Sequence, residues 1–110
     1  MRWTMTVVAV CTVATGAFAQ EMTEAKKDAM RRAGNVYLAA PECAAYKNDP
    51  LIMQNQMKAA ARALGKSGQF PTVSDQLQAT NEVVQLYSSG QFRTDATGQA
   101  ACDLVDEAMR

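Results

Sequence analysis

The sequence predicts an all-α fold, a small antiparallel bundle of about four helices tied by one disulfide between Cys43 and Cys102. Three observations support this fold class. Apolar residues recur at steps of three and four positions in four segments, which places them on one face of a helix. Glycine, proline and capping residues separate these segments. No segment keeps the alternation of apolar and polar residues that marks a strand.

Residues 1–19 have the features of a cleaved signal peptide. Arg2 gives a positive start, an apolar stretch runs over 5–13, and Ala17-Phe18-Ala19 is the small-x-small pattern that signal peptidase recognises. We therefore expect export and cleavage after Ala19. The remaining residues, 20–110, are too few for a second core and form a single helical domain.

A membrane anchor and a lipidated cysteine are the alternatives for this leader. The apolar stretch is interrupted by threonines and Gly16, and it is shorter than the roughly 20 residues that cross a bilayer. Lipidation at Cys11 would follow a small residue, whereas Val10 stands there. The leader thus predicts a periplasmic or secreted protein with no stable membrane insertion after cleavage.

Cleavage would leave two cysteines in an oxidising compartment, where a pair forms a disulfide. Closing the loop from Cys43 to Cys102 would stabilise the fold by about 4 kcal/mol in the chain-entropy model. A redox pair is the alternative, but the two residues are not arranged as Cys-x-x-Cys. A structural disulfide is the prediction.

The first helix is predicted over 23–40. Pro41 discourages its continuation, and Asp28 and Arg32 stand on its outer face at i,i+4 with the acid first, the favourable orientation. Its predicted apolar face consists of Met22, Ala25, Ala29, Ala33, Val36, Tyr37 and Ala40.

The second helix has the clearest start, because Asp49 can cap free N–H groups and Pro50 at the first helical position loses nothing by lacking one. Gly65 or Gly68 ends it. Its predicted buried stripe consists of Met53, Met57, Ala60, Ala61 and Leu64.

The third helix begins near Thr72 or Ser74 and stops at Gly90, and the fourth spans about 97–109. The predicted stripe of the third consists of Leu77, Thr80, Val84 and Tyr87. The fourth would bury Ala101, Leu104, Val105 and Ala108, with Cys102 at the edge of that face.

Ser67-Gly68-Gln69-Phe70-Pro71-Thr72 recurs as Ser89-Gly90-Gln91-Phe92-Arg93-Thr94, with five of six positions identical. We interpret the repeat as a reused corner. The glycine stops a helix in the left-handed conformation, the phenylalanine plugs the helix end, and the threonine caps the next helix. The alternative is a twin binding edge, in which Gln69, Phe70, Gln91 and Phe92 are the candidate partner contacts.

Charge divides unevenly along the chain after the leader. Residues 20–66 carry eight basic and five acidic side chains, or +3, whereas residues 67–110 carry two basic and six acidic, or −4. We interpret this polarity as two halves that attract each other in the fold, with a basic docking patch as the alternative. A near-neutral chain does not predict a nucleic-acid partner.

The residue types present argue against the common catalytic sites. There is no histidine, both mature cysteines are assigned to the disulfide, and no phosphate loop or EF-hand motif occurs. We therefore predict no catalytic, cofactor-binding or metal-binding residues. Asp103, Asp106 and Glu107 are the only acidic cluster, interpreted as a solvated helix face, with a carboxylate-dependent hydrolase as the alternative.

Elimination leaves protein binding as the expected function, with another envelope or secreted protein as partner. An inhibitor, an immunity factor or an accessory subunit of an envelope complex would fit. By size, export and disulfide the chain is also similar to the acid-activated periplasmic stress chaperones, which gives the alternative function.

Overall fold

The computed structural model describes residues 23–110, so the leader, its cleavage site and Met22 lie outside the described residues. This part of the chain contains α-helices, one 3-10 helix and no strand. The elements are α2 (Glu24–Lys47), η1 (Pro50–Asn55), α3 (Gln56–Lys66), α4 (Val73–Tyr87) and α5 (Gln99–Met109). The all-α prediction with its Cys43–Cys102 disulfide is confirmed. Within the same residues, no helix combines the length and apolar character needed to cross a membrane.

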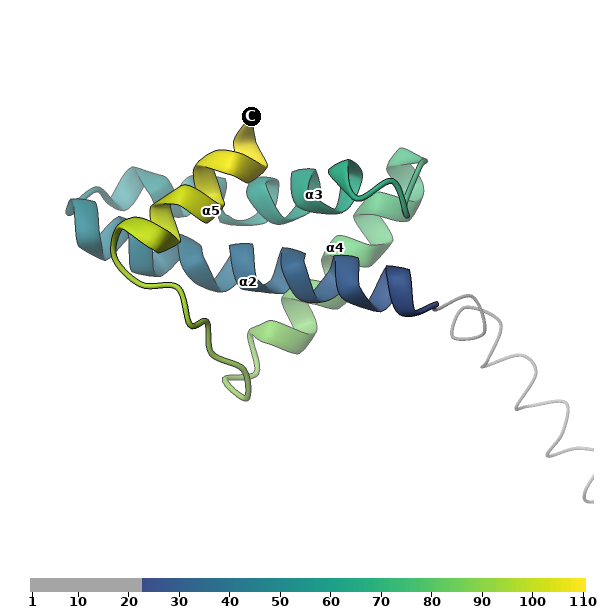
Figure 1. Ribbon diagram of the computed structural model, residues 1–110, viewed down its shortest axis with the longest axis horizontal. Helices are drawn as coiled ribbons and strands as arrows, with labels where there is room; N and C mark the ends of the chain where they lie inside the picture. Colours follow the sequence, from purple (N-terminus) through teal and green to yellow (C-terminus); the bar gives the residue numbers. More distant parts are fainter. Residues whose placement is uncertain (1–22) are drawn as a thin grey trace, which may run out of the picture.

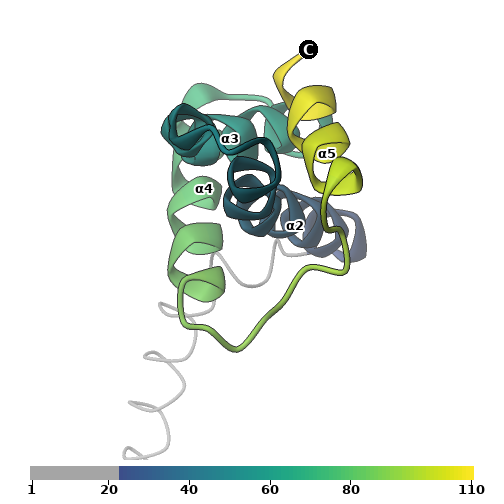
Figure 2. The ribbon, with the colours of Figure 1, turned by 90° about the vertical axis from the view of Figure 1, so that its left-hand side faces the viewer.

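Helix α2 is the central element of the bundle. It contacts α3, α4, α5 and η1, whereas α4 and α5 do not contact each other. Figure 1 shows α2 and α3 running antiparallel along the long axis. In the view of Figure 2, α4 and α5 lie on opposite sides of this pair. The two later helices are therefore separate attachments to one α2–α3 hairpin.

This arrangement divides the core into two clusters. One joins the second half of α2 to α3 and α5, and its buried residues are Val36, Ala39, Ala40, Cys43, Ala59, Ala101, Cys102, Val105 and Ala108. The other joins the first half of α2 to α3 and α4, and its buried residues are Ala29, Ala33, Ala60, Leu64, Phe70, Ala79, Val83 and Tyr87.

Small side chains dominate both clusters and allow close helix packing. The largest fully buried side chains are Leu64, Val83 and the two cysteines. One close approach is at Gly34 of α2, where an added Cβ would lie 2.2 Å from Cζ of Tyr87. The Tyr87 ring thus rests directly on the α2 backbone. Because alanine buries less apolar area than leucine or phenylalanine, the disulfide matters more here than in a leucine-rich core.

The predicted end of the first helix at Ala40 is wrong, because α2 continues through Pro41 to Lys47. Proline has no N–H for the carbonyl four residues back, which here belongs to Tyr37. The Gln56 side-chain amide donates to that carbonyl at 2.8 Å. Burial of Cys43 and Ala44 beyond the proline further favours the helical conformation.

The predicted buried stripes of the second and third helices are wrong in part. Met53, Met57 and Leu77 are exposed, whereas Ala59, Ala79 and Val83 are buried. The second helix begins as η1, whose three residues per turn shift the phase of the residues that follow. In α4 the predicted members Thr80 and Tyr87 are buried, and Ala79 and Val83 complete the stripe in place of Leu77 and the half-buried Val84. On the predicted apolar face of the first helix, Ala25 is wrong as well, because it is exposed.

Three predicted helix starts and the surface ion pair are confirmed, whereas the fourth helix begins at Gln99, two residues after the predicted Thr97. Thr23 accepts from the N–H of Lys26 at 3.2 Å. Asp49 accepts from the N–H of Leu51 at 3.1 Å, and Thr72 accepts from that of Asp75 at 3.0 Å. On the outer face of α2, Arg32 Nε lies 3.0 Å from Oδ2 of Asp28.

Candidate functional site

Both copies of the repeated hexapeptide build the same helix stop. In each, the serine hydroxyl donates to the carbonyl three residues back and accepts from the N–H two residues ahead. These distances are 2.5 and 3.2 Å for Ser67, and 2.8 and 3.3 Å for Ser89. The next residue is left-handed in both, with φ of 76° at Gly68 and 85° at Gly90. The predicted glycine stops are confirmed.

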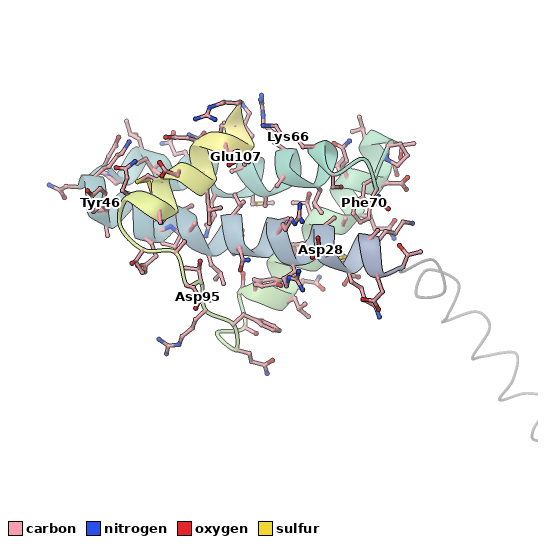
Figure 3. The ribbon with its side chains drawn as sticks, viewed as in Figure 1. Asp28, Tyr46, Lys66, Phe70, Asp95 and Glu107 are labelled. Atoms are coloured by element: carbon pink, nitrogen blue, oxygen red, sulfur yellow. A yellow bond between two sulfur atoms is a disulfide. The ribbon has the colours of Figure 1, made fainter. Side chains whose placement is uncertain are left out.

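The two phenylalanines of the repeat have different surroundings. Phe70 is 4% exposed and belongs to the core cluster that joins α2, α3 and α4. Lys26 Nζ lies 5.8 Å from its ring centroid. Phe92 is 41% exposed, with its ring centroid 4.7 Å from that of Tyr87. Figure 3 shows Phe70 at the α3–α4 junction, far along the molecule from Tyr46. Phe70 is therefore the plug, while Phe92 with its exposed neighbour Gln91 keeps the surface that a partner contact requires.

The other members of the repeat also diverge. Gln69 is half-buried, so it offers less surface than Gln91. Thr72 caps α4, but Thr94 accepts from the N–H of Ala96 at 3.1 Å within a loop, and α5 begins only at Gln99. The prediction of a helix cap at the second threonine is wrong, because no helix follows it directly.

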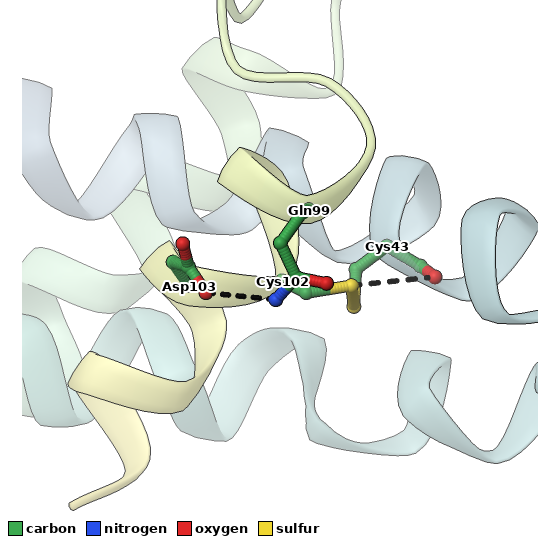
Figure 4. Close-up of a disulfide and its surroundings, with 4 residues drawn as sticks. All are labelled: Cys43, Gln99, Cys102 and Asp103. Carbon is green, nitrogen blue, oxygen red and sulfur yellow. Dashed lines mark hydrogen bonds between the residues drawn. A yellow bond between two sulfur atoms is a disulfide. The ribbon is translucent and has the colours of Figure 1, made fainter.

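The disulfide lies between the middle of the chain and the start of α5 (Figure 4). The Cα atoms of Cys43 and Cys102 are 4.7 Å apart, and both residues are buried. Cys43 belongs to α2 itself rather than to a segment after the first helix. Next to the bridge, the Gln99 side-chain amide donates to Asp103 at 2.9 Å. The bridge thus pins the first turn of α5 to α2.

The acidic cluster of α5 has the exposure expected of a solvated face. Asp103, Asp106 and Glu107 are all exposed. Among the described residues, no group of three or more histidine, cysteine, aspartate or glutamate side chains is placed to hold a metal ion.

Basic side chains of α3 reach the carboxyl end of α5. Arg62 donates to the carbonyl of Met109 at 3.2 Å, and Lys66 donates to the carbonyl of Glu107. The last carbonyls of a helix have no partner inside it and carry partial negative charge, so cations there are stabilising. These contacts join basic side chains of α3 to backbone carbonyls of α5 rather than to its acidic side chains, so the predicted attraction between the two charged halves stays a prediction.

A cleft of about 250 Å³ opens between α2, α3 and α5, and we name it the central cleft. Its apolar lining comes from Ala29, Val36, Ala63, Leu104 and Ala108. Its polar lining comes from Arg32, Asn35, Lys66, Ser67 and Glu107. Figure 3 shows Lys66 and Glu107 close together beside α3 and α5.

A second hollow, of about 420 Å³, lies where α2 turns into η1, and we name it the tip hollow. It is lined by Pro41, Ala44, Ala45, Asn48, Asp49, Pro50 and Met53. Two large exposed side chains adjoin these residues in sequence, Tyr46 at 58% and Leu51 at 63%. The Tyr46 ring lies beside Gly98 at the start of α5, whereas Met53, which is 40% exposed, lines the hollow itself.

The sequence-based prediction missed both hollows. The tip hollow depends on α2 passing Pro41, and the central cleft depends on three helices that are distant in sequence. The available signal was the apolar pair Tyr46 and Leu51 around the Asn48-Asp49-Pro50 turn, since a turn exposes its flanking side chains.

Comparisons with models of known protein families, with characterised proteins and with solved structures give no match for this chain. A proposal for its function therefore depends on the chemistry of its own surface.

Proposed function

We propose that this chain is an exported, periplasmic or secreted, helical protein that acts by binding another protein of the envelope or secreted space. An inhibitor, an immunity factor or an accessory subunit would use such a surface. The disulfide fits an oxidising compartment, and the leader pattern at residues 1–19 supports export.

The observation that carries the proposal is the apolar tip. Leu51 and Met53 are 63% and 40% exposed; Met53 lines the tip hollow with Pro41 and Pro50, and Leu51 directly follows Pro50. Single exposed apolar residues are ordinary on a protein surface, but apolar residues gathered around a hollow mark interaction sites. A partner side chain seated in the tip hollow would remove this apolar surface from water.

The experiment is affinity capture from a periplasmic extract with residues 20–110 as bait. In the tip variant, Leu51→Ser and Met53→Ser are combined. The matched control combines Val73→Ser and Leu77→Ser, which removes two apolar side chains of similar exposure from α4. A protein retained by the wild type and the control, but lost with the tip variant, supports the proposal. Equal loss in both variants, or retention by both, contradicts it.

A pH titration separates this function from that of an acid-activated chaperone. A binding protein of the proposed kind stays native from neutral to strongly acidic pH, whereas the chaperone loses near-ultraviolet circular dichroism and binds an apolar dye. Acid-induced loss of packing accompanied by suppression of client aggregation would favour the chaperone.

A further inference from the structure

We propose that the central cleft is a binding site for a small carboxylic acid with a short apolar chain. The site lies on different residues from the tip hollow and is independent of the proposed protein-binding function. It combines an apolar lining from three helices with two basic side chains, Arg32 and Lys66.

The apolar lining sets the size of the ligand. Val36 and Leu104 face the cleft together with three alanines, Ala29, Ala63 and Ala108. Its volume of about 250 Å³ is below the range of pockets that hold drug-sized molecules, about 300–1,000 Å³. The cleft therefore suits a short chain rather than a long lipid tail.

The two cations keep hydrogen-bond donors free for a ligand. Arg32 uses its Nε toward Asp28, at 3.0 Å, and a guanidinium has further N–H groups in a planar fork that matches a carboxylate. Lys66 donates to the carbonyl of Glu107, which leaves two of the three ammonium protons. Each of these contacts therefore leaves N–H donors of a cleft-lining side chain available to a ligand.

Glu107 adds a negative charge to the same lining. Its carboxylate repels an anionic ligand and attracts a cationic one. The direction in which its removal changes the affinity for each ligand can therefore be measured. Removal of this charge should tighten carboxylate binding and weaken binding of an amine.

The chain offers a matched control for each cation. Arg31 pairs with Asp28 as Arg32 does, and Arg62 caps the end of α5 as Lys66 does. Neither Arg31 nor Arg62 lines the cleft. Comparison within each pair separates a role in binding from a role in stability.

The probes are hexanoate, 1-hexanol and hexylammonium, titrated into ¹⁵N-labelled protein comprising residues 20–110 and followed by amide chemical shifts. We expect hexanoate to bind with a Kd on the order of 1 mM, with shifts confined to the central cleft. We expect 1-hexanol and hexylammonium to bind more weakly. Stronger binding of hexylammonium, or shifts outside the cleft, would overturn the proposal.

The variants test the contacts. Lys66→Gln and Arg32→Gln should each weaken hexanoate binding by about fivefold, whereas Arg62→Gln and Arg31→Gln should change it less than about twofold. Glu107→Gln should tighten it by about twofold. Equal effects within each matched pair would refute a binding role for the cleft cations.

A filled cleft gives a test that does not depend on charge. Asn35→Trp adds an indole at the lining, and Asn81→Trp places the same side chain on the exposed face of α4. Asn35→Trp should abolish binding while its amide spectrum remains that of a folded protein; Asn81→Trp should retain it. If Asn35→Trp unfolds the chain, the lysine and arginine pairs still decide the proposal.

A peptide carboxyl terminus carries the same chemistry, and one further arm distinguishes it. The tripeptide acetyl-Ala-Ala-Leu with a free carboxylate should bind more weakly than hexanoate, because its backbone is bulkier than the cleft allows. Tighter binding of the tripeptide would overturn the assignment to a small acid.

Discussion

The side-chain amide of Gln56 donates a 2.8 Å hydrogen bond to the carbonyl of Tyr37, the group that Pro41 leaves without its helical partner. A residue at the start of α3 thereby repairs the backbone of α2. The contact also joins the two helices that form the central hairpin.

Gln56→Ala should destabilise the protein by about 1–3 kcal/mol, because it leaves a carbonyl unpaired in a partly buried position. In a Pro41→Ala background the same change should cost less than about 0.5 kcal/mol, since the alanine backbone supplies the missing N–H. Urea unfolding of the wild type, the two single variants and the double variant measures this double-mutant cycle. An equal cost in both backgrounds would mean that Gln56 does not act through the proline.

The hydrogen bond between Gln56 and Tyr37 also explains why the sequence predicted the end of α2 too early, at Ala40. The disfavoured continuation at Pro41 is a local signal, whereas its repair comes from a residue fifteen positions away by chain, known only once α3 has folded back. The exposed Met53 and Met57 have a similar cause, because residue spacing does not reveal that 50–55 winds as a 3-10 helix. By contrast, the caps at Asp49 and Thr72 and the stops at Gly68 and Gly90 depend on neighbours in sequence, and they were predictable.

Gly34→Ala should cost about 1–3 kcal/mol, because the new methyl group would overlap the Tyr87 ring. Gly65→Ala is the control: the three atoms nearest its Cβ belong to the end of the Gln76 side chain, at 3.3–3.4 Å rather than 2.2 Å, and alanine favours the helix. We expect that change to be neutral or stabilising in thermal unfolding. The prediction fails if both substitutions shift the melting temperature in the same direction.

The two phenylalanines of the repeated corner should differ in their contribution to stability. Phe70→Ala should cost about 3–5 kcal/mol, as expected for a buried aromatic ring. Phe92→Ala should cost about 1 kcal/mol, because it removes an exposed ring that contacts Tyr87. Chemical denaturation of each variant measures the difference. Similar costs would show that both corners are plugged alike.

Replacement of both cysteines, Cys43→Ala with Cys102→Ala, should reduce the free energy of unfolding by about 4 kcal/mol. The alanine-rich core around the bridge has few large side chains to offset that loss. Urea titrations of the wild type with and without reductant, beside the double variant, give the measurement. A reduction below about 1 kcal/mol would place the stability of the fold in its packing alone.

Trypsin should cut the native protein first after Arg93. Arg93 is exposed in the loop between α4 and α5, whereas the other basic residues between 23 and 109 lie in α2 and α3. Two of these, Lys47 and Lys66, end their helices, but the segments that follow them are short and folded back by hydrogen bonds to the preceding turn. Helical peptide bonds must unfold before a protease can bind them, so the loop is cleaved first.

After this cut the two fragments should remain joined by the Cys43–Cys102 bridge, gaining one water in mass and separating only after reduction. Helical circular dichroism should be retained, because α5 keeps its packing on α2 and α3. Arg93→Gln should remove this early cut, and a first cut within α2 or α3 would show that the hairpin opens more readily than the loop.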